Sequence, residues 1–351
     1  MSKEHGGLEA FFNNVWYGKS FWFVVFLPLT IVFALIASLR RVLYRNGILS
    51  SENVTVPVVV VGNIAVGGAG KTPVTLWLAQ YLKSKGMNPA IISRGYGGEA
   101  TSSTVIVNEQ SDPALVGDEP VLLARRSGCP VFVDADRVRG ATNAIENGFD
   151  VILSDDGLQH YRLQRDIEIA VVDGSRGFGN GWLLPAGPLR ELVSRLATVD
   201  RVLVQQGKAD DSRLADETFS DRVTNFSLVG ETLLKVTDGR LLQLSELAGK
   251  SVHAVAGIAH PERFFKYLEQ QGIKVLRHPL RDHARLSDTD VHFDDDLDVV
   301  VTEKDAVKCT AFAHDRLWYL PVDVVFEKGA DMQWLGALHD KLQLSVTQEP
   351  A

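Results

Sequence analysis

The stretch Gly62-Asn63-Ile64-Ala65-Val66-Gly67-Gly68-Ala69-Gly70-Lys71-Thr72-Pro73 decides how the rest of this chain is interpreted. A largely β-branched apolar run, Val56–Val61, lies directly before it. After it, apolar residues recur at helical spacing from Val74 to Leu82. A strand, a glycine-rich turn, Lys-Thr and a helix, in this order, predict a P-loop that binds the phosphates of a nucleotide.

The residue types of this loop suit phosphate. Glycines let backbone N–H groups turn toward phosphate oxygens without Cβ clashes, and the N-terminus of the following helix adds partial positive charge. We expect Lys71 to reach the β- and γ-phosphates and the Thr72 hydroxyl to take a Mg²⁺ position. The other phosphate-facing residues are Gly67, Gly68, Ala69 and Gly70. Ala65 stands where the motif usually has its first glycine, so a turn that is merely rich in glycine is the alternative.

Length, charge and cysteine content narrow the class of protein. A chain of 351 residues suggests two domains, or one large domain with an appendage. Its net charge of −8 argues against non-specific nucleic-acid binding as the main task, and we expect no nucleic-acid partner. Cys129 and Cys309 are far apart and lack metal-type spacing. We therefore expect neither a disulfide nor a structural zinc, as suits a reducing compartment.

Phe21–Leu39 is an uncharged apolar segment near the N-terminus. As a helix it would be roughly 28 Å long, close to the thickness of the hydrocarbon layer of a membrane. Aromatic residues precede it and arginines follow it, namely Trp16, Tyr17 and Trp22, then Arg40, Arg41 and Arg45. This asymmetry places the globular part in the cytoplasm. A spanning helix, a helix lying in the membrane interface and an apolar core helix all remain open.

Between residues 51 and 351, β-branched runs alternate with helical stretches, which predicts an α/β fold with a mostly parallel sheet covered by helices on both faces. We expect an N-terminal membrane-anchor segment at 1–50, a P-loop core at 51–228, a two-stranded linker ribbon at 229–250 and a second α/β domain at 251–351. Strands of the core are expected at Val56–Val61, Ala90–Ser93, Val105–Val107, Val131–Val133, Val151–Leu153, Ile167–Val172 and Arg201–Val204.

Asp155 and Asp156 end the apolar run that begins at Val151. A strand that delivers an acidic residue beside a P-loop is typical of the Mg²⁺ site of nucleotide-hydrolysing and kinase folds. Neighbouring strand residues point to opposite faces, so we expect one Asp to bind the metal and the other to orient or cap. A turn rich in Asp and Gly is the alternative.

Several further motifs are weaker. Asp118 and Glu119 precede Pro120 and could act as a general base and a metal contact, or could cap a helix. Arginines in candidate loops could clamp phosphate or lie solvated at the surface; they are Arg94, Arg137, Arg139 and Arg190. Thr302 and Asp305 fit a helix cap, with a nucleotide contact by Lys304 as the alternative. His160 and His283 each suit a structural role as well as a catalytic one.

Together these motifs resemble the tetraacyldisaccharide 4'-kinases, also called lipid A 4'-kinases. These enzymes phosphorylate the disaccharide 1-phosphate precursor of lipid A with ATP at the cytoplasmic face of the inner membrane. The matching pieces run in order over nearly the whole chain and are Gly62-Asn63 with Val66–Pro73, Ser93–Gly98, Gly117–Pro120, Asp155–His160, Gly187–Glu191, Ala256–Ala259 with Pro261–Phe264, Asp282-His283 and Thr302–Asp305.

The resemblance implies roles for individual residues. The catalytic base falls on Asp118, with His283 as its partner, and Lys71 and Arg190 act on the transferred phosphate. Arg94, Arg137 and Gln159 join the loop in holding ATP, while Thr72, Asp155, Asp156 and Glu119 belong to the Mg²⁺ site. The implied partners are an acylated disaccharide lipid and the inner membrane, and we expect a monomer.

Two other functions compete with this hypothesis. A P-loop ATPase or GTPase switch, of the partition or metallochaperone type, would hydrolyse nucleotide without a lipid acceptor. A metallochaperone would also want a His- or Cys-rich site, which the sequence lacks. A membrane-tethered scaffold would leave the pairing of Gly-Lys-Thr with two aspartates unexplained.

Overall fold

The computed structural model describes residues 4–18, 20–95, 103–206, 211–330 and 332–347. The chain forms two compact units. Unit 1 comprises Met1–Ser93, Asp136–Ser227 and Phe326–Ala351, and unit 2 comprises Arg94–Ala135 and Leu228–Val325. This division differs from the expected domains, because residues 94–135 group with the C-terminal part and the last helix groups with the P-loop part.

Unit 1 is organised around a parallel sheet with the strand order β8-β7-β6-β1-β5-β2. The strands are β1 (Val58–Gly62), β2 (Pro89–Ser93), β5 (Val151–Asp155), β6 (Ile167–Asp173), β7 (Arg201–Gln205) and β8 (Val223–Val229). β1 is buried along its whole length and pairs with β5 and β6. Val61 lies opposite Asp155, so the P-loop after β1 and the aspartates of β5 meet at the same edge of the sheet.

Helices follow these strands in unit 1, as the alternating pattern predicts. α3 (Lys71–Ser84) packs on β1, β2 and β5, and α6 (Arg137–Glu146) packs on β2. The other helical elements of unit 1 that follow the P-loop are α10 (Gln333–Thr347) and the 3₁₀ turns η1 (Val193–Thr198), η2 (Ser212–Ala215) and η3 (Ser220–Arg222). α3 presents Val74, Leu78 and Leu82 to the sheet, all of them fully buried, which is the helical spacing read from the sequence.

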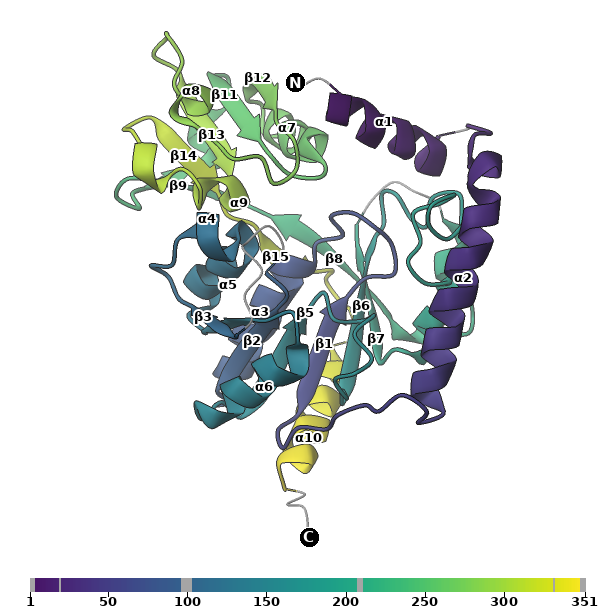
Figure 1. Cartoon of the computed structure of the whole chain (residues 1–351). Helices are drawn as coiled ribbons and strands as arrows, with labels where there is room; N and C mark the ends of the chain where they lie inside the picture. The colour runs from purple at the N-terminus through teal and green to yellow at the C-terminus, as the bar shows by residue number, and fades with distance from the viewer. Residues whose placement is uncertain (1–3, 19, 96–102, 207–210, 331, 348–351) are drawn as a thin grey trace. The chain divides into compact units, whose positions relative to one another are not determined.

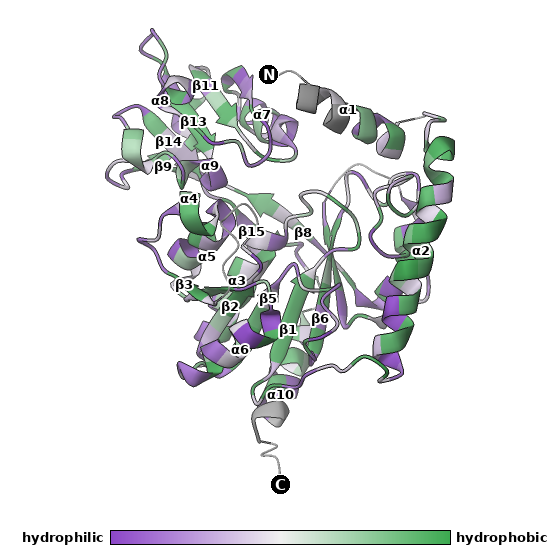
Figure 2. Ribbon diagram, viewed as in Figure 1, coloured by the Kyte–Doolittle hydropathy of each residue, from purple (hydrophilic) through white to green (hydrophobic). Residues whose placement is uncertain are grey.

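Two N-terminal helices, α1 (Glu4–Tyr17) and α2 (Phe23–Arg45), belong to unit 1 (Figure 1). α2 is apolar along most of its length and polar near its C-terminal end (Figure 2). It is the helix in the described part of the chain that is long and apolar enough to cross a membrane. Thr30 is its buried residue, while Val25, Leu35 and Ile36 are more than 60% exposed. This exposure rules out the alternative of an apolar core helix.

Unit 2 contains a second sheet with the order β10-β9-β14-β13-β11-β12. Its strands are β9 (Thr232–Lys235), β10 (Leu241–Gln243), β11 (Ser251–Ala256), β12 (Lys274–Pro279), β13 (Asp298–Thr302) and β14 (Leu317–Leu320). Unit 2 also holds the antiparallel pair β3 (Val105–Val107) and β4 (Val131–Val133). Its helices are α4 (Pro113–Val116), α5 (Asp118–Ser127), α7 (Pro261–Gln270), α8 (Asp288–Val291) and α9 (Glu303–Ala306), with the 3₁₀ turns η4 (Leu244–Leu247) and η5 (Thr310–Phe312).

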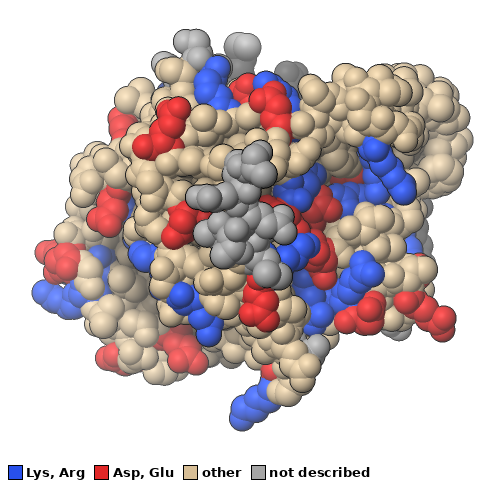
Figure 3. Space-filling view, turned by 90° about the horizontal axis from the view of Figure 1, so that it is seen from below, with Lys and Arg blue, Asp and Glu red and all other residues tan. Residues whose placement is uncertain are grey.

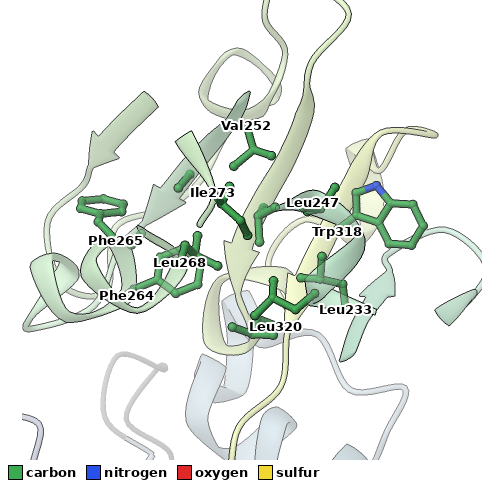
Figure 4. Close-up of a cluster of buried hydrophobic side chains, with 13 residues drawn as sticks. Leu233, Leu247, Val252, Phe264, Phe265, Leu268, Ile273, Trp318 and Leu320 are labelled. Atoms are coloured by element: carbon green, nitrogen blue, oxygen red, sulfur yellow. The ribbon is translucent and has the colours of Figure 1, made fainter. Parts of the chain in front are cut away.

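The core of unit 2 is an apolar layer between α7 and its sheet (Figure 4). Phe265 and Leu268 of α7 pack with Val252 and Leu320 of the strands, and each is 3% exposed or less. A second cluster, which includes Val255, Val301 and Leu317, lies on the alternate residues of the same strands. The central strands are therefore buried on both sides, which explains their continuous apolar runs.

The expected fold class is confirmed, and most expected strands lie within two residues of their observed positions. The ribbon expected at 229–250 contains the antiparallel hairpin of β9 and β10, but β9 pairs with β14 as well, so the ribbon is part of the unit 2 sheet. The apolar run at 317–325 forms two strands rather than one, β14 and β15 (Asp323–Phe326). Pro321 lies in the break, where a residue without a backbone N–H cannot continue a ladder.

Acidic and basic side chains are intermixed on the face drawn in Figure 3.

Candidate active site

The P-loop of unit 1 ends in a helix N-terminus that backbone geometry leaves open to an anion. Gly70 precedes α3 in the left-handed conformation, with φ 86°, and it has no side chain with which to cap the helix. Gly67 has φ 117°, a conformation that favours glycine. The first N–H groups of α3 have no partner within their own helix and carry its partial positive charge. These features fit a bound phosphate.

The loop is held in shape by the segment after residue 186. Val66 N donates to Pro188 O at 2.8 Å, and Arg190 N donates to Ile64 O at 2.7 Å. Asn63 is 2% exposed, and its Nδ2 donates to Gly67 O at 3.3 Å. Hydrogen bonds from the backbone of residues 188–190 and from the Asn63 side chain therefore hold the loop.

Lys71 and Arg190 converge on the carboxylate of Asp156. Lys71 Nζ lies 3.6 Å from Asp156 Oδ1, and Arg190 Nη1 lies 3.1 Å from both carboxylate oxygens. Burial opposes ionisation of Asp156, but the two cations outweigh it, and the pKa of Asp156 lies below its usual value. Asp156 also has φ 48°, a strained conformation for a residue with a side chain. Two cations are thus directed at one anionic position at the mouth of the loop.

Asp155 lies deeper than Asp156 and is tied to α3. Its side chain is 3% exposed, and Oδ1 accepts a hydrogen bond from Thr75 Oγ1 at 3.2 Å. Thr72, the second residue of α3, is half-buried one turn earlier on the same helix. The two aspartates therefore have different surroundings, but not through alternation along a strand, because β5 ends at Asp155 and Asp156 lies in the turn that follows.

Arg137 donates hydrogen bonds near the C-terminal ends of β5 and β2. It is 5% exposed, and its Nη1 donates to Asp155 O at 2.7 Å and to Ser154 Oγ at 3.1 Å. Its Nη2 donates to Asp156 O at 3.1 Å. Its guanidinium group therefore fixes the backbone that carries both aspartates. Nucleotide binding by Arg137 stays a prediction.

Gln159 braces the entry to the P-loop. Its Nε2 donates to Asn63 O at 3.0 Å and to Glu191 Oε1 at 2.7 Å. The adjacent residue, His160, is neutral at physiological pH because burial, together with Arg137 and Arg165, lowers its pKa to about 4. A neutral imidazole suits packing as well as catalysis, so the role of His160 stays a prediction.

Unit 2 holds a second polar group, centred on Asp118 at the start of α5. Asp118 is 6% exposed, and its Oδ1 accepts hydrogen bonds from Glu119 N at 2.9 Å and from His283 Nδ1 at 3.2 Å. Lys308 Nζ lies 3.6 Å from Oδ2. Burial raises the pKa of Asp118, but the His283 hydrogen bond and the charges of Lys304 and Lys308 outweigh burial and lower that pKa to about 2.

His283 is held in an unusual conformation beside Asp118. Its φ is 56°, and its backbone N donates to Asp282 Oδ1 at 3.1 Å. The hydrogen bond to Asp118 raises the pKa of His283, while burial and Lys304 oppose that rise. Among the described residues, Asp156 and His283 are the non-glycine residues with positive φ. Each unit thus stores backbone strain at its polar group, which is common at functional sites.

The predicted cap of α9 is confirmed, since Thr302 Oγ1 accepts a hydrogen bond from Asp305 N at 3.2 Å. Arg126 of α5 donates to Glu303 of α9 at 2.7 Å, so the two helices are tied together within unit 2. Lys304 of α9 then reaches Glu119 Oε1 at 2.9 Å.

A family model described as tetraacyldisaccharide-1-P 4'-kinase matches residues 22–340. The chain belongs to this family. It is 43% identical over 341 residues to the tetraacyldisaccharide 4'-kinase of Actinobacillus succinogenes, covering 96% of this chain and 99% of that one. It is 48% identical over 298 residues to the enzyme of that name from Alkalilimnicola ehrlichii, covering 84% and 86% of the two chains.

A solved structure is also similar, namely LpxK from Aquifex aeolicus in complex with ATP. It matches with a TM-score of 0.74 and 28% sequence identity, covering 91% of this chain and 99% of that one. The likeness therefore extends to both units of this tetraacyldisaccharide 4'-kinase family member.

The structure groups the predicted site residues of this 4'-kinase family member by unit. Unit 1 brings together Lys71, Arg190 and Asp156, with Asp155 and Gln159 beside them, and unit 2 brings together Asp118, His283 and Glu119. Arg94 is exposed in unit 2, and its motif continues into residues 96–98, which lie outside the described residues. The role of Arg94 therefore stays a prediction.

Three contributors were not singled out from the sequence. Asn63 and Glu191 brace the loop, and Thr75 binds Asp155. Asn63 and Glu191 lie inside quoted motifs, so their polar type in an apolar context was a usable signal. Thr75 carried none, because a threonine in an apolar helix face is usually a packing residue.

Proposed function

We propose that this chain transfers the γ-phosphoryl group of ATP to the 4'-hydroxyl of a tetraacyldisaccharide 1-phosphate. The product is the bis-phosphorylated lipid A precursor, lipid IVA, so the reaction is a step of lipopolysaccharide biosynthesis. Family membership over residues 22–340 supports the substrate. The observation that carries the chemistry is the uncapped N-terminus of α3, together with Lys71 and Arg190, which both pair with the carboxylate of Asp156.

In this proposal unit 1 holds the nucleotide. The N–H groups of residues 67–72 bind the phosphates, as the open loop and the left-handed Gly70 favour. Lys71 and Arg190 then neutralise the charge of the group being transferred. Asp156 holds these two cations in position.

The residues also fit Mg²⁺, which supplies charge neutralisation on the phosphates when it is bound. Thr72 with Asp155 or Asp156 would hold it, since hydroxyl and carboxylate oxygens are its preferred protein ligands. In the described residues, no three His, Cys, Asp or Glu side chains cluster as a ready-made metal site. The role of Glu119 at the metal stays a prediction, because in unit 2 Glu119 pairs with Lys304.

Asp118 is proposed to accept the proton of the sugar hydroxyl, with His283 as its positioning partner. A carboxylate with a pKa of about 2 is a weak base. Phosphoryl transfer tolerates a weak base, because its loose transition state asks for orientation of the attacking oxygen more than for early proton removal. Oδ1 of Asp118 already accepts two hydrogen bonds, so the hydroxyl is proposed to approach Oδ2, which lies 3.6 Å from Lys308 Nζ.

We also propose that α2 lies in the membrane interface of the inner membrane, on its cytoplasmic side, rather than crossing it. Unit 1 contacts α2 at several points along its length. The ring of Phe23 stacks on that of Trp182, with 6.3 Å between the ring centroids. Further along the helix, Thr30 Oγ1 donates a hydrogen bond to Leu183 O at 3.3 Å. Near its C-terminal end, Arg41 Nη2 donates to Thr198 Oγ1 at 3.3 Å. A spanning helix could not keep these contacts unless unit 1 entered the hydrocarbon. The exposed face of α2 is apolar and suits the acyl-chain region.

A membrane position also suits the substrate. Each acyl CH₂ group that leaves the bilayer costs about 0.8 kcal/mol, so a four-chain lipid is reached far more easily in place.

Labelled ATP should be incubated with the full-length protein and a panel of lipid acceptors. Label on a tetraacylated disaccharide 1-phosphate supports the proposal. Hydrolysis that proceeds equally without any acceptor supports a nucleotide switch instead.

A further inference from the structure

We propose that Lys304 is a positioning residue that holds His283 in the tautomer with hydrogen on Nδ1, so that the ring donates to Asp118. This inference rests on the proposed function of Asp118 as the proton acceptor. It concerns residues of unit 2 alone, and it adds a residue that neither the motif nor the resemblance assigns to the chemistry.

The geometry places His283 between an acceptor and a donor. Its Nδ1 lies 3.2 Å from Asp118 Oδ1, and its Nε2 lies 3.2 Å from Lys304 Nζ. An ionised carboxylate only accepts hydrogen bonds, whereas an ammonium group only donates them. Both contacts are hydrogen bonds in one state alone, namely neutral imidazole with hydrogen on Nδ1 and a lone pair on Nε2.

The other two states of the ring each conflict with a neighbour. Hydrogen on Nε2 would point at the Lys304 ammonium and leave the Nδ1 lone pair facing the Asp118 carboxylate. A ring protonated on both nitrogens would keep the Asp118 contact but again point Nε2–H at Lys304. Neighbours commonly set the tautomer of a functional histidine in this way.

Lys304 is well placed to remain an ammonium. Its side chain is 15% exposed, and Nζ lies 2.9 Å from Glu119 Oε1 and 3.6 Å from Asp282 Oδ1. Burial disfavours its charge, but these carboxylates and Asp118 outweigh burial and raise its pKa above the ordinary lysine value. The charged groups that surround the ring are Asp118, Glu119, Asp282, Lys304 and Lys308.

The consequence for Asp118 is a fixed orientation. Hydrogen bonds from His283 and from Glu119 N both end on Oδ1. The carboxylate therefore cannot rotate without losing one of them, and Oδ2 stays directed away from these donors. Loss of Lys304 would free the ring to take the other tautomer and would release the carboxylate. A misplacement of a reacting group by about 1 Å lowers the rate about 10²-fold.

The test begins with the intact protein. Full-length protein labelled with ¹⁵N-histidine, measured at an alkaline pH above the raised pKa of His283, should show a neutral ring with Nδ1 protonated and Nε2 unprotonated. The signal is assigned by its loss in His283→Gln. A neutral His283 ring with its hydrogen on Nε2 overturns the inference at once. This measurement needs no variant of Lys304 and no lipid, so it stands apart from the outcome of the phosphotransfer assay.

The variants then connect tautomer to rate. Lys304→Met keeps a similar length without a donor, and it should shift hydrogen to Nε2 and lower kcat about 10²-fold, with the KM for ATP unchanged. Lys304→Arg, which can only donate, should restore the Nδ1–H tautomer and most of kcat. Lys274→Met removes an exposed lysine of the same unit and serves as the control.

Each contrary outcome has its own meaning. An unchanged kcat in Lys304→Met overturns the positioning role, and a raised KM for ATP would make Lys304 a nucleotide contact instead. Failure of the wild-type protein to phosphorylate any disaccharide lipid would overturn the proposed function, while the histidine spectrum would still report whether Lys304 sets the tautomer.

Discussion

The polar groups of the two units are built in contrasting ways. In unit 1 the P-loop offers backbone N–H groups and two cations, and its shape is held by main-chain hydrogen bonds from residues 188–190. In unit 2 the group around Asp118 is made of side chains that fix one another, from Glu119 through Lys304 and His283 to Asp118. Backbone N–H groups suit the binding of a phosphate, because the phosphate group has the same shape in every nucleotide. A chain of hydrogen-bonded side chains suits proton transfer, because that transfer depends on which side-chain atom carries the proton.

This contrast predicts that variants in unit 1 and unit 2 will fail in different ways. Lys71→Ala should have the largest effect, a fall in kcat of about 10³-fold or more, because it removes a cation from the transferring phosphate. It should also raise the KM for ATP. Lys85→Ala, an exposed lysine just after α3, is the matched control. Near-normal turnover in Lys71→Ala would mean that the loop binds no reacting phosphate.

Asp118→Asn should lower kcat by about 10²- to 10⁴-fold, the range for loss of a general base, and leave the KM for ATP within a few-fold. It should also lower the pKa of His283, because the hydrogen bond to Asp118 is the main cause that raises it above the usual 6.5. NMR titration of His283 measures this shift. Asp294→Asn, an exposed carboxylate of unit 2, is the control.

The pH dependence has a definite sign. Because Asp118 has a pKa of about 2, it remains ionised through the range in which enzymes are usually assayed. The acidic limb of kcat/KM should therefore follow His283 and fall at a pH above 6.5, since its pKa is raised. Protonation would add a second N–H, facing Lys304, and disturb the pair. An acidic limb near pH 4 would contradict this assignment.

A charge on the exposed face of α2 should have a moderate effect. Leu35 is 65% exposed, so Leu35→Asp should weaken binding to vesicles about tenfold or more by placing a carboxylate among acyl chains. Turnover of a detergent-dispersed acceptor should stay within about twofold. Lys85→Asp is the control for added negative charge in unit 1. Equal vesicle binding by Leu35→Asp would exclude insertion of this face.

Thr30→Val should have the smallest effect. Thr30 Oγ1 donates to Leu183 O and accepts from Ala186 N at 3.0 Å, so its loss leaves two buried backbone groups without that partner. The expected cost of about 1–2 kcal/mol corresponds to a fall in Tm of about 2–4 °C, measured by thermal unfolding in detergent. Thr30→Ser keeps the hydroxyl and should retain most of the stability. An unchanged Tm for Thr30→Val would mean that these bonds do not dock α2.

The sequence predicted the unit 1 group better than the unit 2 group, for a physical reason. The loop, Lys71 and Thr72 are contiguous, and the aspartates end a strand whose partner strand carries the loop. Parallel pairing alone brings them together. In unit 2, Asp118 and His283 are 165 residues apart, and their meeting depends on tertiary packing and on a strained residue 283. The resemblance to a family suggested that pair, whereas spacing did not.

Other features lay beyond local patterns. Arg137 donates to the main-chain oxygens of Asp155 and Asp156. Every residue has a main-chain oxygen, so the residue types in the sequence do not indicate these contacts. Strand β8 was missed although its alternation is visible, with Thr224 and Phe226 buried and Asn225 exposed. Its polar residues interrupt the apolar runs by which the other strands were predicted. The sequence predicts a cap by Thr302 and Asp305, which the structure shows, and offers a nucleotide contact for Lys304 as the alternative. The contact of Lys304 with His283 depends on tertiary packing, which no local pattern indicates.

The most direct test of the central claim is the Kd for ATP measured beside single-turnover transfer in Lys71→Ala and Asp118→Asn. The account predicts that Lys71→Ala weakens ATP binding and abolishes transfer. It predicts that Asp118→Asn binds ATP within about threefold of wild type yet transfers at least about 10²-fold more slowly. Equal loss of ATP binding in both variants, or wild-type transfer by Asp118→Asn, would contradict the division of labour between the two units.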